Sequence, residues 1–160
     1  MNSPQILSAL PATEPAHDCA QCPRLAAYRQ TCHSEFSNFW NAPVPAFGDP
    51  DAWLAIIGLA PGKHGANRTG RPFTGDPSGE MLFAGLRDFG LITYDPPEYT
   101  RHLFGGFRDD GASLNGVMIL NAVKCVPPEN KPTPEEMRTC RPYLESALAA
   151  LPKLTTIIAL

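Results

Sequence analysis

Four cysteines are spaced along the chain in a way that suits a metal centre. Cys19 and Cys22 form a Cys-x-x-Cys pair, and Cys125 and Cys140 follow far downstream, 15 positions apart. Thiolates are the ligands of both [4Fe–4S] clusters and tetrahedral zinc ions, and the spacing alone does not choose between the two. Four unrelated core cysteines are the alternative. Cys32 is left over, and we interpret it as a plain buried residue.

A glycine-rich segment, residues 58–76, carries basic side chains. No acidic residue occurs over 52–75, whereas Lys63, Arg68 and Arg71 fall inside that stretch. Glycines let backbone amides approach a phosphate or a base, and a local basic face is enough for nucleic-acid binding. The three cations are therefore candidate phosphate contacts, although charge alone favours an ordinary solvated loop. A nucleotide P-loop is excluded, because the span from the first glycine to Lys63 is one residue too short and histidine replaces the required Ser or Thr.

Two polar side chains lie at expected strand and helix ends. Asn121 closes an Ile-Leu-Asn run, and Asp76 ends the glycine-rich segment. A carboxamide offers a donor and an acceptor, which matches the hydrogen-bonding edge of a nucleobase. The alternatives are an asparagine that satisfies local backbone groups and an aspartate that only caps a helix.

Six elements must position these side chains. Periodicity and apolar runs predict strands over 53–59, 117–123 and 155–160. Capping residues and prolines predict three helices, over 19–33, from a cap at Ser78 to Gly90, and from Thr133 to about Leu151. The last helix should kink or restart at Pro142. Alternation of helix and strand is typical of an α/β sandwich with a parallel sheet and right-handed crossovers. Ligands bind at the carboxyl ends of such strands, so the glycine-rich segment and Asn121 should share one crevice.

Length and composition are those of a single folded domain. The chain has 160 residues, 43% hydrophobic and 18% charged, and a net charge of −3, which argues against disorder and against a general polyanion binder. We expect a flexible tail over 1–15, a domain over 16–160, no signal or membrane-spanning segment, and a cytoplasmic location. The chain ends on an apolar strand, from which we expect that part of the domain is missing; the alternative is a complete domain with Leu160 at a sheet edge.

Six segments together form a specific pattern: Cys19-x-x-Cys22-Pro-Arg-Leu, Gly-Leu-Ala-Pro-Gly at 58–62, Gly-Ala-Asn-Arg-Thr-Gly-Arg-Pro-Phe-Thr-Gly-Asp at 65–76, Asn-Ala-Val-Lys-Cys at 121–125, Pro-Pro-Glu-Asn-Lys-Pro-Thr-Pro at 127–134 and Cys-Arg-Pro-Tyr at 140–143. In this order they resemble the family 5, or type B, uracil-DNA glycosylases, iron–sulfur enzymes of base excision repair. The resemblance covers nearly the whole chain. Leu59 stands where the related family 4 enzymes carry Glu, which favours family 5.

The resemblance implies a three-layer αβα fold with a short central parallel sheet, and a monomeric hydrolase that removes uracil or other deaminated bases flipped out of DNA. It implies a [4Fe–4S] cluster on the four cysteines, with a structural role because hydrolysis moves no electrons. It also assigns roles to individual residues: base stacking to Phe73, base binding and catalysis to Asn121, catalysis to Asp76, and pocket lining to Ala60 and Gly62. In such an enzyme we expect Lys63, Arg68 and Arg71 to hold nearby phosphates without reading sequence.

The family also carries a His-Pro-Ser type motif near its C-terminus, and this chain ends before that point. We therefore expect the last strand and helix of the fold to be missing. A catalytically inactive iron–sulfur or zinc-binding domain is the alternative to an active glycosylase, and a redox or zinc protein of unrelated function is a third interpretation. For Asp76, stabilising the sugar cation and orienting the attacking water both stay open.

Overall fold

The computed structural model describes residues 12–94 and 111–160 of the chain. Its elements, in order, are α1 (Pro23–Glu35), β1 (Phe47–Gly48), β2 (Leu54–Gly58), α2 (Ala66–Thr69), α3 (Pro77–Asp88), β3 (Ile92–Tyr94), β4 (Ala112–Leu114), β5 (Val117–Asn121), the 3-10 turn η2 (Pro128–Asn130), α4 (Pro134–Ala149) and β6 (Thr156–Ala159). The predicted alternation of helix and strand is confirmed by α1, β2, α3, β5, α4 and β6. None of the helices in the described ranges is both long and apolar enough to cross a bilayer.

The main sheet has the strand order β1-β5-β2-β6. The three predicted strands β5, β2 and β6 pair in parallel, and the short β1 adds an antiparallel edge. Sequence patterns missed β1 and the separate antiparallel pair of β3 and β4, because strands of two or three residues are too short for periodicity to reveal.

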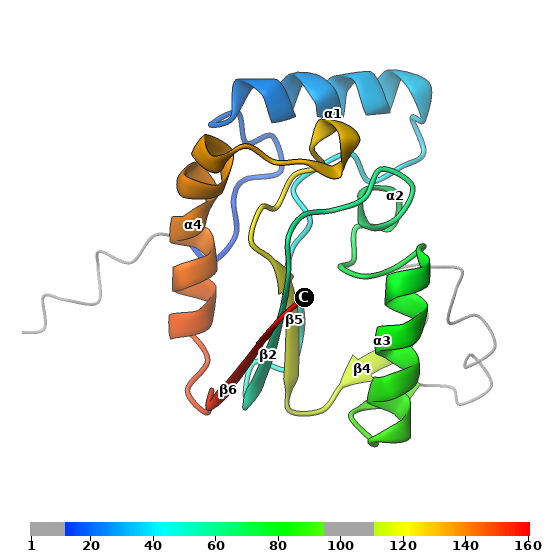
Figure 1. Ribbon diagram of the computed structural model, residues 1–160, viewed down its shortest axis with the longest axis vertical. Coiled ribbons are helices and arrows are strands. Elements are labelled where there is room, and N and C mark those ends of the chain that lie inside the picture. The colour runs from blue at the N-terminus through cyan, green and yellow to red at the C-terminus, as the bar shows by residue number, and fades with distance from the viewer. Residues whose placement is uncertain (1–11, 95–110) are drawn as a thin grey trace, which may run out of the picture.

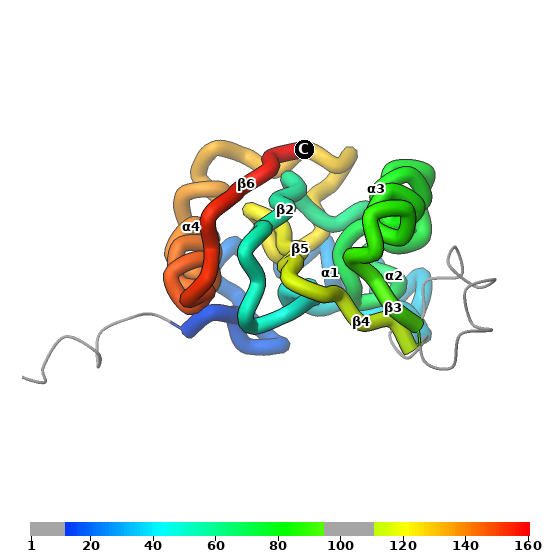
Figure 2. The backbone as a smooth tube through the Cα atoms, turned by 90° about the horizontal axis from the view of Figure 1, so that it is seen from below, coloured from blue at the N-terminus to red at the C-terminus, as the bar shows by residue number. Residues whose placement is uncertain are grey.

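Helices cover both faces of the sheet, so the predicted three-layer αβα architecture is confirmed. Figures 1 and 2 show α4 on one side of β2, β5 and β6, and α3 on the other. Neighbouring residues of β2 point to opposite faces. Leu54 and Ile56 pack in the core that contains Phe83 of α3, whereas Ala55 packs with Ala147 of α4.

Helix α1 lies across the end of the sheet where β2 and β5 finish (Figure 1). Leu25 of α1 packs there against Val123, which follows β5. The predicted start at Cys19 is wrong: the helix begins at Pro23, because proline suits the first helical position and Cys22 is its N-cap. Both residues of the Cys-x-x-Cys pair therefore precede the helix.

Capping explains where α3 and α4 begin. The predicted cap at Ser78 is wrong, since Asp76 is the N-cap of α3 and its side chain accepts a hydrogen bond from the Gly79 backbone N–H. The predicted start of α4 at Thr133 is confirmed by a capping box, in which Thr133 and Glu136 exchange side-chain and backbone hydrogen bonds. Helix α4 continues through Pro142 without a restart.

One residue of the predicted tail is held against the domain. Glu14 Oε1 accepts hydrogen bonds from the Ala46 backbone N–H at 2.8 Å and from Lys124 Nζ at 3.1 Å. The Lys124 side chain is fully buried, and removing one partner of a buried ion pair leaves an uncompensated charge. The part of the predicted tail that the structure describes is thus anchored at Glu14. The division of the chain into a tail over 1–15 and a domain over 16–160 stays a prediction.

Candidate functional site

A hollow opens where β2 and β5 end side by side. Gly58 at the end of β2 pairs with Asn121 at the end of β5, and the glycine-rich segment folds over both. The residues that line the hollow are Gly58, Leu59, Ala60, Gly62, Ala66, Phe73, Asp76, Ser78, Asn121 and Leu160. All five residues predicted to bind the base or to catalyse its release are among them. The hollow has a volume of about 260 Å³, just below the ~300–1,000 Å³ typical of drug-sized ligands, so its size suits a small planar ligand.

Phe73 and Asn121 approach each other over Gly58. A Cβ atom added at Gly58 would lie 2.7 Å from Asn121 Oδ1 and 2.8 Å from the ring of Phe73, so a larger residue is excluded without a shift of both groups. Asn121 is 3% exposed, and its Nδ2 has no hydrogen-bond partner among the described residues. A buried amide donor without a partner is costly, and here it belongs to a side chain that lines an open hollow.

The backbone at Phe73 is strained. Its φ is 55°, in the left-handed region that a residue other than glycine rarely adopts. Hydrogen bonds on either side hold this conformation. Thr74 Oγ1 donates to the Arg71 carbonyl at 2.7 Å and is also bonded to Thr69 Oγ1. Such strain clusters at binding sites, where the surrounding structure fixes a side chain in place.

Asp76 both caps α3 and lines the hollow. Its Oδ1 accepts hydrogen bonds from the Gly79 backbone N–H at 2.9 Å and from Ser78 Oγ at 2.6 Å. Its other oxygen, Oδ2, faces the glycine-rich segment, only 2.9 Å from the place of a Cβ at Gly65 and 4.0 Å from that at Gly62. The cap therefore orients the carboxylate and leaves one oxygen directed at the lining of the hollow.

The three predicted phosphate-binding cations have different surroundings. Lys63 Nζ pairs with Glu35 Oε2 at 2.5 Å, which raises the pKa of Lys63 above its ordinary value. Arg68 Nε donates to the His64 carbonyl at 2.9 Å. Arg71 is only 4% exposed.

Arg71 does not lie at the surface predicted for it. Its guanidinium packs 4.9 Å from the ring centre of Phe47 and 5.5 Å from that of Phe83, which are cation–π contacts of the core. The sequence pattern misplaced it because the aromatic partners come from distant segments. A buried guanidinium cannot reach a DNA phosphate at the surface, so we propose no phosphate contact for Arg71.

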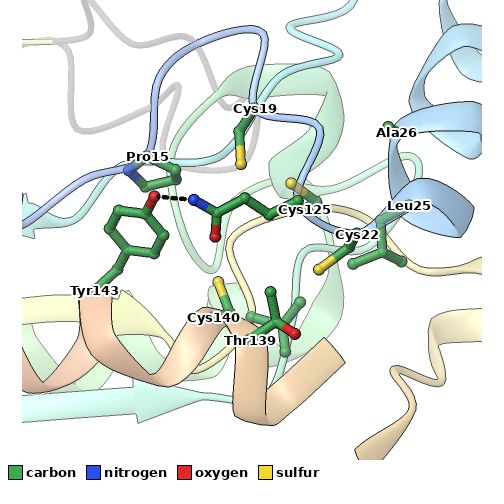
Figure 3. A pocket seen from close by; sticks show the side chains of 11 residues that line it. Pro15, Cys19, Cys22, Leu25, Ala26, Cys125, Thr139, Cys140 and Tyr143 are labelled. Atoms are coloured by element: carbon green, nitrogen blue, oxygen red, sulfur yellow. Dashed lines mark hydrogen bonds between the residues drawn. The ribbon is translucent and has the colours of Figure 1, made fainter. Parts of the chain in front are cut away.

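The four predicted metal-ligating cysteines line one pocket beside α1, with Cys19 and Cys22 before α1, Cys125 after β5 and Cys140 in α4. Figure 3 shows their sulfur atoms directed toward a common space, with Tyr143 beside it. Apolar residues, including Leu25 and Val123, complete the lining. Cys32 is fully buried and is not part of this lining, as predicted for the leftover cysteine.

The donors in this pocket are thiols, of which Cys125 and Cys140 are buried and Cys19 and Cys22 half-buried. Burial raises the pKa of Cys125 to about 12 and also raises the pKa values of Cys22 and Cys140. A positive group would favour the thiolates. Among the described residues, no three Cys, His, Asp or Glu side chains have the arrangement of a site for one metal ion.

Sequence reasoning missed Gly58 as a site residue, although a glycine at the end of a central strand is a signal for close approach of another group. It also gave no role to Ser78 beyond a helix cap, whereas Ser78 donates to Asp76 and lines the hollow. No sequence signal pointed to Arg29, a buried cation that donates to the Cys19 carbonyl.

Comparisons with known proteins find a matching family model and several similar chains. A family model described as "Uracil DNA glycosylase superfamily" matches residues 45–160 of this chain. The chain is similar to the type-5 uracil-DNA glycosylase of Thermus thermophilus, with 45% identity over 147 residues, covering 89% of this chain and 63% of the relative. For the type-5 enzyme of Pyrobaculum aerophilum the identity is 43%, covering 84% of this chain and 58% of the relative.

A type-4 uracil-DNA glycosylase of Pyrobaculum aerophilum is more distant, at 32% identity over 144 residues, which cover 89% of this chain and 55% of that relative. The chain thus spans less than two thirds of the length of these relatives.

Proposed function

Since the chain belongs to the uracil-DNA glycosylase superfamily, we propose that it hydrolyses the N-glycosidic bond of uracil, and of other deaminated bases, flipped out of DNA. One observation carries this proposal: the Phe73 ring and the unpartnered Asn121 amide line one hollow at the carboxyl ends of β2 and β5. An aromatic face and an amide edge are what recognition of a single extruded base requires.

The base would lie in the hollow between the Phe73 ring and the Asn121 amide, which pack close together because Gly58 beneath them has no side chain. Phe73 stacks on its face, which recovers about 1–3 kcal/mol of the cost of unstacking. Asn121 donates from Nδ2 to a carbonyl oxygen of the base and accepts at Oδ1 from its ring N–H. Both side chains are fixed before the base arrives, Asn121 by its position in the sheet and Phe73 by the bonded loop around it.

Hydrolysis breaks the bond between the base nitrogen and C1′ of the sugar. The bonding electron pair leaves with the base, which becomes an anion and then takes a proton, and the oxygen of a water molecule forms the new bond to C1′. Asn121 stabilises the negative charge that develops on the base. Asp76 places a negative charge beside the sugar as positive charge develops there.

DNA would approach the side of the hollow formed by the glycine-rich segment. Lys63 and Arg68 are the proposed phosphate contacts, since both keep partly exposed side chains on this segment. They hold the backbone without reading its sequence. We also propose that the protein acts as a monomer.

The cysteine pocket would hold a [4Fe–4S] cluster. Four thiols from three parts of the chain line it, and the resemblance to family 5 points to this cluster. When bound, the cluster supplies positive iron that favours the thiolates, and it joins α1, the segment after β5 and α4. A reducing cytoplasm, where disulfides are rare, suits such a site.

Base release from DNA tests the proposed activity directly. The 160-residue chain, with its cluster content measured, is incubated with a duplex that carries one U·G mismatch, and abasic sites are detected by alkaline strand cleavage. The same duplex with thymine in place of uracil is the control. We expect release from the first duplex alone; a chain that holds the cluster but releases no base would be the inactive domain instead.

Gly58→Ala tests the proposed position of the base. The added methyl group meets both the Phe73 ring and Asn121, and displacement of either group by about 1 Å is expected to lower base release about 10²-fold. Gly85→Ala is the matched control, because a Cβ at Gly85 has no neighbour within 4 Å. Equal release rates for the Gly58 variant and the wild type would place the base elsewhere.

A further inference from the structure

Arg29 is a buried cation on the face of α1 that borders the cysteine pocket. The buried residues of α1 are Leu25, Arg29 and Cys32, and their spacing puts them on one side of the helix. Leu25 lines the cysteine pocket. Arg29 is 7% exposed, and a guanidinium removed from water to this extent requires compensation by acceptors or by negative charge.

Acceptors compensate only part of that charge. Arg29 Nη1 donates to the His17 carbonyl at 3.0 Å, and Nη2 donates to the Cys19 carbonyl. Arg29 Nε is buried without a hydrogen-bond partner among the described residues. The ion pairs between described residues are those of Arg24, Lys63, Arg87, Lys124 and Lys153, so no described carboxylate neutralises Arg29.

The pocket beside this face of α1 is lined by four cysteines, whose thiolates would supply negative charge once a metal group is bound. The Arg29 guanidinium holds the backbone carbonyl of Cys19. Arg29 thus holds the backbone of one proposed ligand, and its charge, which no described carboxylate neutralises, lies on the helix face that borders the pocket of all four.

We propose that Arg29 is a positioning residue of the cysteine site, which fixes the Cys19 segment and balances the negative charge of the four thiolates when a [4Fe–4S] cluster is bound. This inference rests on the cofactor proposed above. Groups around a metal site that orient its ligands typically change metal affinity about 10–100-fold when they are replaced. The net charge near a cluster also sets its reduction potential.

Two substitutions separate the two parts of this role. Arg29→Gln removes the positive charge, so we expect about 10–100-fold faster loss of the cluster in air and a lower reduction potential, since an added electron is no longer stabilised by the cation. Arg29→Lys keeps the charge but loses the forked guanidinium. We expect it to keep the wild-type potential and to lose the cluster faster than the wild type. The measurements are iron and sulfide per chain, visible absorption over time, and a reductive titration.

Arg141→Gln is the matched control, because Arg141 is exposed, follows Cys140 in sequence and makes the same change of charge. If the wild type contains no iron and sulfide, the proposed cofactor is wrong. If it does, and Arg29→Gln has the potential and cluster lifetime of Arg141→Gln, only the role of Arg29 is overturned. Should Arg29→Gln not fold, Arg29→Lys decides: cluster loss at the wild-type rate would overturn the proposal.

Discussion

Asp76→Asn is expected to lower base release by about 10²–10⁴-fold, the range for a positioned group that assists bond cleavage. The substitution removes the negative charge beside the sugar but keeps an oxygen that can accept the hydrogen bonds of Ser78 and Gly79. Asparagine caps helices about as well as aspartate, so the thermal stability should change little. DNA binding should also persist, because the phosphate contacts are proposed to come from other residues.

Ser78→Ala is the control for this experiment. It removes the hydroxyl that donates to Asp76 Oδ1 at 2.6 Å and leaves both the carboxylate and the Gly79 cap bond in place. A modest loss of base release is therefore expected from a less constrained carboxylate. Release and binding are measured on the same U·G duplex, by single-turnover kinetics and by a titration. Near wild-type release by Asp76→Asn would remove Asp76 from the mechanism.

The main elements of the fold follow from local sequence. The apolar runs of β2, β5 and β6 and the capping box of α4 carry their own signals, and parallel pairing then brings their carboxyl ends together. This is why the glycine-rich segment, which follows β2 and ends in Asp76, and Asn121 at the end of β5 could be expected at one crevice from the sequence. The role of Phe73 within that segment came from the resemblance. The convergence of the segment and Asn121 on one hollow is the part of the prediction that depends least on the resemblance.

Contacts between distant segments were not predictable in the same way. Arg71 looked like a surface cation, but Phe47 and Phe83 enclose it. Lys63 looked unpaired, but Glu35 at the end of α1 lies beside it. Nothing in the sequence near Arg29 shows that it is buried, since its partners are backbone carbonyls. A charged residue type therefore does not by itself show that a side chain lies at the surface, because contacts with distant segments decide its burial.

Cys125→Ala is expected to have the largest effect on stability. Cys125 follows β5, and a cluster bound to it would join that segment to Cys19, Cys22 and Cys140. Because the binding free energy of such a group is also folding free energy, the loss of one ligand should lower the iron content and the unfolding temperature together. Base release should fall as well, since Asn121 lies only four residues before Cys125.

Cys32→Ala separates this effect from the loss of any buried thiol. Cys32 is 0% exposed, at least as buried as Cys125 at 8%, but it does not line the cysteine pocket. Its replacement leaves a small cavity in the core, with an expected cost of about 1 kcal/mol and no change in iron content. Thermal unfolding and iron analysis of both variants are compared with the wild type. A Cys125→Ala protein that matches Cys32→Ala in both measurements would contradict a structural cluster, because the four thiols would then be ordinary members of the core.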